Sequence, residues 1–171
     1  LPQHTLLKDV TAPTEIVGDG SKKGKAALID GDIHTFFAGK KNQAYGDTYM
    51  VMLTKAVEVQ DVRICFKATN GDELKGGKVE VSADGKKWQS LVVKGTSSTQ
   101  SSPARRQKLD EDLYAVDFVA KNPITAKYVR LVVTQPITNK WLRLSEILVN
   151  TQYFAQQFAP AAADNQQNGQ P

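Results

Sequence analysis

The chain has 171 residues, of which 40% are hydrophobic, and a formal net charge of +4. No stretch approaches the roughly 18 consecutive apolar residues that a membrane span needs, and no charged start followed by an apolar block resembles a signal peptide. This composition predicts one domain that buries its own core, with loose segments at its ends.

The positive charge is scattered over lysines and is not gathered on one face. Its densest groups lie at 21–25 and 40–41, beside glycine and polar residues typical of loops, so no nucleic-acid partner is predicted. The single cysteine, Cys65, excludes an internal disulfide, and its apolar neighbours indicate a buried thiol. Because His4 and His34 lie in separate contexts, no nucleophilic triad is predicted.

The first predicted elements are a lead-in segment and a series of strands. Residues 1–25 are expected to pack on the domain as the lead-in segment. From Asp47 onward, short runs of β-branched and aromatic residues alternate with turn-forming residues, which is typical of an all-β sandwich or barrel. Consecutive strands are predicted at 49–53 and 57–66. Val79 and Val81 alternate with polar neighbours, so both are expected to face the core.

The clearest predicted hairpin follows. Its turn at 83–86 contains Asp84 and Gly85, a pair that suits a tight turn because glycine accepts positive φ at no steric cost, and the returning strand is predicted at 88–93. The Ser/Thr/Gln run at 96–103 and the charged run at 105–112 are together predicted to form a long exposed loop without a strand.

The last predicted strands lie at 114–119, 124–134 and 142–149, with a break at Gln135–Pro136. The domain is expected to end near Asn150. Residues 151–171 are rich in Gln, Ala, Asn and Pro, which predicts a linker or tail. Because the first residue is Leu1 and not methionine, we expect the chain to be part of a longer polypeptide.

Three segments at matching spacing, 27–37, 79–88 and 126–131 leading to 144–149, together resemble the discoidin or coagulation-factor type-C domain. Within that superfamily they are most similar to the carbohydrate-binding modules of family 32, over residues 26–150. The resemblance implies a jelly-roll β-sandwich of about eight strands in two antiparallel sheets, related to galactose-binding domains. It also implies that the ligand loops cluster at one end.

The resemblance further implies a structural calcium ion. Its ligands would be Asp30, Asp32, Thr35, Glu146 and a backbone carbonyl near Ala27, so the ion would join the two ends of the domain. The residue types agree with this chemistry, because Ca²⁺ takes about six to eight oxygen ligands and an Asp-Gly-Asp turn presents several. The alternative is that Asp30–Asp32 is an ordinary turn and Glu146 an ordinary surface carboxylate.

A sugar site needs an aromatic face for the apolar side of the ring and polar groups for its hydroxyls. Tyr45 is the aromatic residue expected to be most exposed, Trp141 could belong to the core or to the rim of the site, and Phe36, Phe37 and Trp88 are expected to serve packing. The predicted ligand-binding residues are Asn42, Tyr45, Lys67, Asn70 and Trp141, chosen from loop candidates that also include Phe37, Lys40, Gln43, Asn139 and Lys140.

The resemblance therefore implies a non-catalytic carbohydrate-binding module, appended to a larger secreted glycoside hydrolase of bacterial origin. Residues 138–147 are loosely similar to modules of β-N-acetylhexosaminidases and hyaluronidase-like enzymes. The expected partners are a glycan ending in galactose or an N-acetylhexosamine and the catalytic domain of the same polypeptide. The expected location is secreted, periplasmic or at the cell surface.

Two other classes of function are open to the sequence. A discoidin-like domain can serve adhesion, membrane binding, protein interaction or a purely structural role, although the animal domains of adhesion and membrane binding usually carry a terminal pair of cysteines that this chain lacks. A glycosidase would need two carboxylates facing each other across a cleft. The acidic residues Asp110, Glu111 and Asp112 are contiguous and lie in a predicted loop, which favours a solvated charge run.

Overall fold

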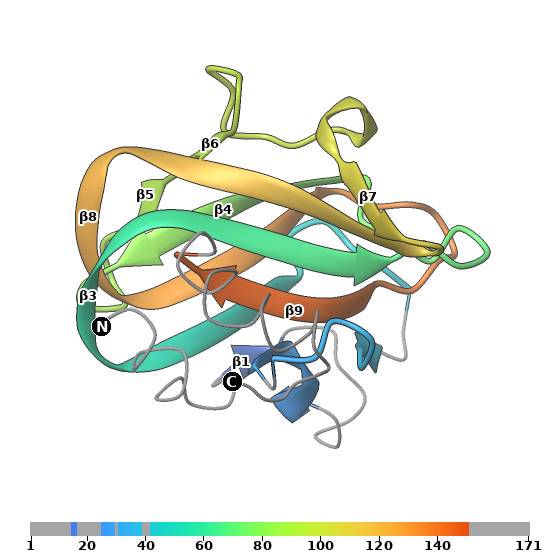
Figure 1. Cartoon of the computed structure of the whole chain (residues 1–171), viewed down its shortest axis with the longest axis horizontal. Helices are drawn as coiled ribbons and strands as arrows, with labels where there is room; N and C mark the ends of the chain where they lie inside the picture. The colour runs from blue at the N-terminus through green and yellow to red at the C-terminus, as the bar shows by residue number, and fades with distance from the viewer. Residues whose placement is uncertain (1–14, 17–24, 30, 39–41, 151–171) are drawn as a thin grey trace, which may run out of the picture.

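The computed structural model describes residues 15–16, 25–29, 31–38 and 42–150 of the chain (Figure 1). Within them the regular structure is strand, apart from two short 3₁₀ helices, and every strand pair is antiparallel. The elements in chain order are β1 (Glu15–Ile16), η1 (Lys25–Ile29), β2 (Phe37–Ala38), β3 (Thr48–Lys67), β4 (Gly76–Ser82), β5 (Gln89–Ser90), β6 (Val92–Val93), η2 (Pro103–Arg105), β7 (Gln107–Asp110), β8 (Leu113–Gln135) and β9 (Arg143–Val149).

Two long strands, β3 and β8, organise the all-β sandwich. They pair with each other along most of their length, and the hydrogen-bonded order of the sheet is β2-β9-β3-β8-β4-β5. The start of β3, the end of β8 and β4 form one layer, while the end of β3, the start of β8 and β9 form the other. The predicted sandwich of antiparallel strands is confirmed, but its two layers are joined by hydrogen bonds because the two long strands pass through both.

Each long strand bends at a bulge. Between Met52 and Val57, β3 advances five positions while its partner β8 advances two, from Tyr128 to Ala126. Further along, β8 advances five positions between Val119 and Ile124 while β3 advances two, between Asp61 and Val59. Extra residues on one strand of a pair bend that strand and increase its twist. The separate strands predicted at 49–53 and 57–66, and at 114–119 and 124–134, are therefore continuous strands with bulges at the predicted breaks.

The bends give the sandwich two different ends. Both bulges lie on the left of Figure 1, whereas β3 and β8 each begin and end on the right. We call the left side the bent end and the right side the loop end. The loops that precede β3, connect β3 to β4 and connect β8 to β9 all lie at the loop end.

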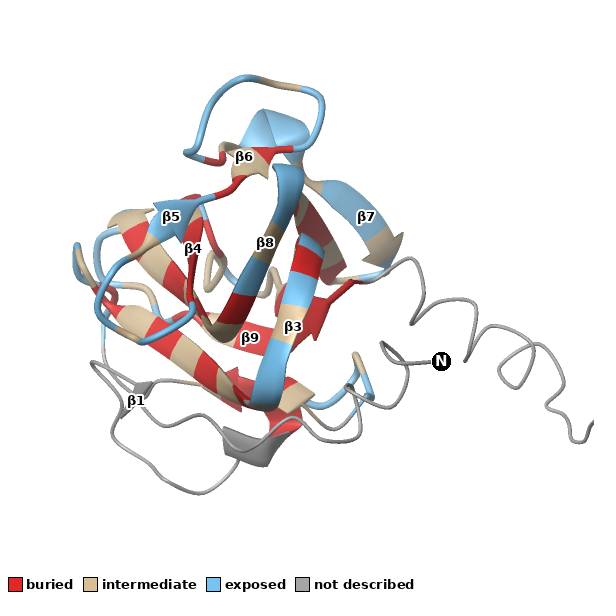
Figure 2. Cartoon of the chain, turned by 90° about the vertical axis from the view of Figure 1, so that its left-hand side faces the viewer, coloured by how far each residue is buried: buried red, intermediate tan, exposed pale blue. Residues whose placement is uncertain are grey.

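The core lies between the two layers and follows the predicted alternation. Val79 and Val81 are fully buried, as predicted, and face Leu131 and Val129 in register on β8. Figure 2 shows buried residues alternating with more exposed ones along the strands. Because one face of each strand packs inward, side chains two positions apart share the core. The largest fully buried side chains include Phe37, Phe66, Phe118, Leu28, Leu53, Ile64, Leu113, Leu131, Leu142 and Leu144.

The predicted hairpin at 79–93 is confirmed at its turn and corrected beyond it. The Asp84 carboxylate accepts the backbone N–H groups of Lys86 and Lys87, and Gly85 has a φ of 80°. After the turn, β5 pairs with β4, but β6 pairs with β8 and does not extend the hairpin. The predicted single strand at 88–93 is therefore two short strands that pair with different neighbours.

The predicted long loop at 96–112 is correct only in its first part. Residues Gln107–Asp110 form β7, which pairs with the start of β8, where Lys108 lies opposite Tyr114. This strand escaped prediction because it is short, charged and mostly exposed, as edge strands commonly are. Thr96 and Ser98 hold the preceding loop through hydrogen bonds from their hydroxyls to backbone carbonyls.

Asn150 is the last residue that the structure describes, and it lies just after β9. It is buried, its side-chain oxygen accepts the N–H groups of Gln60 and Asp61, and its amide donates to the carbonyl of Glu58. Its φ of 57° turns the chain at the end of β9. In the predicted lead-in segment the structure describes β1, which pairs with β3, and Lys25. The rest of that segment and the predicted tail at 151–171 lie outside the described residues.

Candidate functional site

Three loops at the loop end form a candidate ligand site, which we call the rim. They are residues 42–47 before β3, 68–75 between β3 and β4, and 136–142 between β8 and β9. Four of the five predicted ligand-binding residues lie on them, namely Asn42, Tyr45, Asn70 and Trp141. The antiparallel pairing and the bends bring these loops together although they are far apart in the sequence.

Gln43 joins the three loops. Its amide nitrogen donates to the carbonyls of Glu73 (2.8 Å) and Trp141 (3.0 Å), and its amide oxygen accepts the N–H of Ile137 (3.2 Å). Its own backbone N–H donates to the carbonyl of Lys140 at 2.8 Å. The side chain is buried and both amide donors are in use, so this predicted candidate positions the rim and leaves ligand contact to its neighbours.

Asp72 also connects the loops, although the sequence analysis did not identify it. We call Gln43 and Asp72 the joints of the rim, because their side chains bond to backbone groups of other loops. The Asp72 carboxylate accepts the backbone N–H of Trp141 at 3.1 Å and pairs with the guanidinium of Arg143 at 3.0 Å. The turn just before it has positive φ at Asn70 (55°) and Gly71 (82°), and the Lys140 ammonium donates to the Asn70 carbonyl at 2.7 Å. An Asn-Gly pair followed by an acid was the available sequence signal for this turn.

Several exposed side chains surround these joints. Trp141 is 37% exposed and Tyr45 is 76% exposed, so Trp141 belongs to the rim and not to the core. Asn42 donates to the side-chain oxygen of Asn139 at 3.5 Å, and both of these asparagines are exposed. The rim therefore offers aromatic surface and amide groups on a backbone fixed by Gln43 and Asp72. The predicted candidate Lys40 lies outside the described residues.

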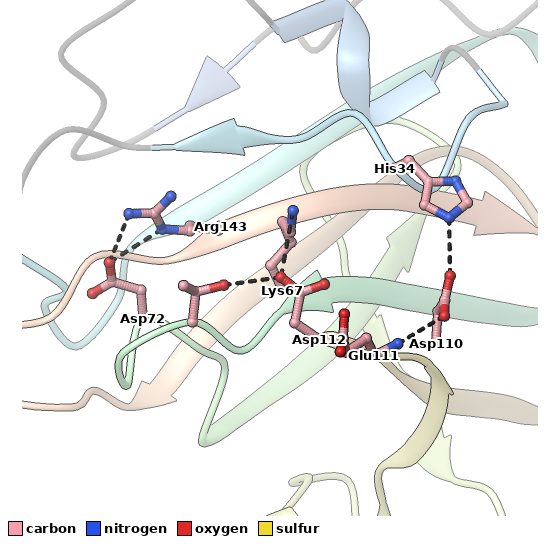
Figure 3. A network of polar contacts seen from close by, with 8 residues as sticks. His34, Lys67, Asp72, Asp110, Glu111, Asp112 and Arg143 are labelled. Carbon is pink, nitrogen blue, oxygen red and sulfur yellow. Dashed lines mark hydrogen bonds and ion pairs between the residues drawn. The ribbon is translucent and has the colours of Figure 1, made fainter.

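Lys67, the fifth predicted ligand-binding residue, is engaged in a neighbouring network (Figure 3). Its ammonium lies 3.5 Å from Asp112 and 4.8 Å from the centre of the Phe36 ring. Arg143 lies 5.5 Å from the same ring and so connects this network to Asp72 and the rim. Phe36 thus packs between cations, whereas Phe37 is the buried core aromatic.

The acidic turn near the start and the closing strand meet, as the resemblance implied. The backbone N–H of Gly31 donates to the Glu146 carboxylate at 2.9 Å, and Glu146 is buried. In the same turn, Asp32 accepts the N–H of His34 at 2.9 Å, and the Thr35 hydroxyl donates to the Asp32 carbonyl at 3.0 Å. The predicted ligand Asp30 lies outside the described residues, among which no cluster of three or more His, Cys, Asp or Glu side chains is suited to a metal ion.

His34 connects this turn to the acidic run at 110–112. Its Nε2 lies 3.2 Å from the Asp110 carboxylate, which also accepts the N–H of Glu111. The Glu111 N–H and the imidazole together lower the pKa of Asp110. Asp110 and Glu111 are exposed, as predicted, whereas Asp112 is half-buried. The two aspartates have separate partners: Asp110 contacts His34, and Asp112 contacts Lys67 and Thr69.

The single thiol is buried, as predicted. Cys65 lies on β3 between Ala115 of β8 and Glu146 of β9 and is fully inaccessible to solvent. Burial raises the pKa of the Cys65 thiol to about 12, so the sulfur stays protonated at neutral pH. It packs as a small hydrophobic side chain.

The sequence matches the family model of the F5/8 type C domain over residues 9–147, and the chain belongs to this family. Among proteins with curated descriptions, none matches the sequence. Within the described residues, no helix is long and apolar enough to cross a membrane.

Solved structures share the fold at low sequence identity. The carbohydrate-binding module CBM32-1 from a family 31 glycoside hydrolase of Clostridium perfringens is 19% identical, with a TM-score of 0.63 over 87% of this chain and 99% of that one. The C-terminal domain of a chitobiase from Bacteroides fragilis is 19% identical, with a TM-score of 0.60 over 85% and 95%. The family 32 module of C. perfringens NanJ, in complex with galactose, is 17% identical, with a TM-score of 0.57 over 84% and 95%. These likenesses establish the discoidin-like sandwich.

Proposed function

We propose that this chain is a non-catalytic carbohydrate-binding module that uses the rim to hold a larger secreted glycoside hydrolase near its glycan. The observation that carries the proposal is the rim itself, where exposed aromatic and amide groups stand on loops fixed by buried hydrogen bonds. A type C domain and a fold shared with modules of glycoside hydrolases support it.

The rim has the two chemical features that a sugar needs. Trp141 and Tyr45 offer apolar faces for the C–H side of a pyranose ring, and Asn42, Asn70 and Asn139 offer amides for its hydroxyls. Because the loops are already fixed, little ordering entropy is lost on binding. For a single site of this kind we expect affinities of about micromolar to millimolar Kd, raised by avidity where several modules act together.

The proposed ligand class is a glycan that ends in galactose or an N-acetylhexosamine. Similar folds have been solved with galactose and with GalNAc-β-1,3-galactose, which supports a neutral terminal sugar. The loop sequence at 138–147, with its loose similarity to modules of hexosaminidases and hyaluronidase-like enzymes, favours an amino sugar. The catalytic domain of the same polypeptide and an extracellular or periplasmic location belong to the same proposal.

We also propose that the domain holds a structural calcium ion at the turn containing Asp32. The donor set is chemically suitable, because Asp30, Asp32, Glu146, the Thr35 hydroxyl and the Ala27 carbonyl are all hard oxygen donors. The contact between Gly31 and Glu146 supports the proposal by placing both segments side by side. A bound ion would stabilise the junction between the start of the domain and β9.

A glycan array with calcium present tests the binding proposal. We expect binding to terminal galactose, N-acetylgalactosamine or N-acetylglucosamine, and Trp141→Ala should weaken it about tenfold or more through the loss of ring stacking. Trp88→Ala is the matched control, because Trp88 lies at the bent end, where the Arg130 guanidinium stacks on its ring at 3.7 Å. Silence across these sugars would overturn the proposal and favour a protein-interaction or structural role.

The calcium proposal has its own test, the melting temperature of the full chain with calcium or with a chelator. We expect calcium to raise the melting temperature, and Asp30→Ala or Glu146→Gln to abolish that rise. Glu80→Gln is the control, since Glu80 is a buried carboxylate on β4 paired with Arg130, away from this turn. It should lower the melting temperature and keep the calcium increment. A melting temperature independent of calcium in the unaltered chain would end the proposal.

A further inference from the structure

A hollow of about 560 Å³ lies at the bent end, on the far side of the molecule from the rim. It is lined by residues of β5 and β6 on one side and by residues 119–125 of β8 on the other. Its volume falls within the range of roughly 300–1,000 Å³ that is usual for small-molecule sites.

The bulge of β8 builds this hollow. Residues 120–123 lie between the register pairs of Val119 and Ile124 with β3, and within the described strands they are not paired in register with β4 or β6 either. All of them line the hollow. Pro123 fits here because a bulge needs no ladder hydrogen bond from it. Bulges often re-aim side chains at functional sites.

The polar side chains around the hollow are not tied to one another. Gln89, Ser90, Lys121, Asn122 and Thr125 are all exposed, and within the described part of the chain their side chains make no hydrogen bond or ion pair. They combine amides, hydroxyls and one ammonium, which together suit a ligand rich in both donors and acceptors.

The lining carries a positive charge without a counter-charge. Lys121 is its only ionisable residue, and no aspartate or glutamate takes part in the lining. The apolar groups are Val92, Val119, Ala120, Pro123 and Ile124, with no aromatic ring among them. A neutral sugar would therefore lack a stacking partner here, and charge has to supply a share of the affinity.

We propose that the hollow at the bent end is a second ligand site, for an acidic oligosaccharide whose carboxylate pairs with Lys121. The amides of Gln89 and Asn122 contact the hydroxyls of the sugar, and its C–H face lies on Ile124 and Pro123. The hollow is a separate site from the rim, and the choice of a saccharide as its ligand rests on the carbohydrate-binding function proposed above.

The test is an amide NMR titration of the ¹⁵N-labelled full chain with tetragalacturonate. The fully methyl-esterified tetramer is the matched ligand control, since it keeps the four rings and loses the charges. We expect saturable shifts at the amides of 89–92, 119–122, 124 and 125, with a Kd of about 0.1–10 mM, and weaker binding as salt is added. The ester should leave these amides unshifted.

Three variants test whether binding depends on the charge of Lys121 itself or on the overall positive charge of the chain. Lys121→Gln should weaken binding about fivefold, as expected for a partly exposed ion pair. Lys108→Gln makes the same change of charge on β7, at the loop end, and should leave binding unchanged. Trp141→Ala should also leave it unchanged, which separates failure of this site from failure of the rim.

Any of three outcomes would overturn the proposal. These are an absence of saturable shifts in 119–125, an equal response to the methyl ester, and a loss of affinity in Lys108→Gln equal to that in Lys121→Gln. A spectrum of Lys121→Gln that matches the unaltered chain away from the hollow shows that the variant is folded, so its binding result counts in either direction.

Discussion

The rim and the hollow lie at opposite ends of one sandwich, and they differ in how their polar side chains are used. At the rim, Gln43 and Asp72 satisfy backbone groups of other loops, and the exposed residues stand on that fixed frame. At the hollow, Gln89, Lys121 and Asn122 leave their polar atoms to solvent. Glutamine serves in both regions: Gln43 is buried and connects the loops of the rim, whereas Gln89 is exposed at the hollow.

Effects on stability and effects on binding can therefore be separated by the end of the sandwich at which a residue lies. A side chain that holds loops together cannot be removed without loosening the fold, because it leaves buried carbonyls and N–H groups without partners. A side chain that faces solvent can be removed at little cost to the fold. Residues of the hollow should therefore affect binding alone, whereas the joints of the rim should affect stability and binding together.

The largest predicted effect concerns Cys65, which reports whether the loop end is closed. A pKa raised from 9.0 to about 12 reduces the thiolate fraction at pH 8 about a thousandfold, and burial blocks access as well. We expect an aromatic disulfide reagent to react at least about a thousandfold more slowly with the folded chain than with the chain in denaturant. Rapid labelling of the folded protein would contradict a closed core at this end.

The next effect is on the free energy of unfolding. Gln43→Ala should lower it by about 2–3 kcal/mol, because the carbonyls of Glu73 and Trp141 and the N–H of Ile137 lose their partner. Gln89→Ala, the matched substitution at the hollow, should change it by less than about 0.5 kcal/mol. Urea unfolding of both variants measures the difference. Equal losses in the two variants would show that Gln43 supports the fold no more than Gln89 does.

A smaller loss is expected at the second joint. Asp72→Asn removes the charge that pairs with Arg143 while keeping an acceptor for the Trp141 N–H, so stability should fall by about 1–2 kcal/mol. Asp112→Asn is the control, since its pair with Lys67 is longer, at 3.5 Å, and more exposed. That control should cost less than about 0.5 kcal/mol. Tryptophan fluorescence during unfolding checks both values and reports on Trp141.

The smallest predicted effect is a local one at low pH, in the turn that leads into the bent end. Backbone N–H groups of Lys87 and Lys86 lower the pKa of Asp84 from 3.8 to about 2. A carboxyl group whose pKa is lower in the folded chain than in the unfolded chain stabilises the fold at pH values above the unfolded-state pKa. This stabilisation is lost as the pH falls through the folded-state pKa. The turn should therefore loosen between about pH 4 and pH 2. Amide shifts of Lys86 and Lys87 should titrate in that window and stop doing so in Asp84→Ala.

The sequence was a good guide wherever the physical signal is local. Alternation placed Val79 and Val81 in the core, and the Asp84–Gly85 pair marked a turn. The meeting of the turn at 30–32 with Glu146 was expected only from the resemblance to a family. No local rule connects residues 115 positions apart.

The features that escaped prediction depend on pairing between distant strands. A break near Lys121 was visible in the sequence, but a bulge exists only relative to the partner strand, and the hollow follows from that bulge. In the same way, the burial of Gln43 depends on contacts with Glu73 and Ile137, which lie 30 and 94 residues later in the chain. Polar residues in loops look alike in sequence whether they become joints or ligand contacts.

The strand β9 begins beside the rim and ends near the bends of the long strands. Its first residue, Arg143, lies beside the rim, while Asn150 is held against Glu58 and Asp61 next to the bends. In the proposed function, a catalytic domain that follows Asn150 would be attached at the end opposite Trp141. The strand β9 would then span the distance between that attachment and the rim.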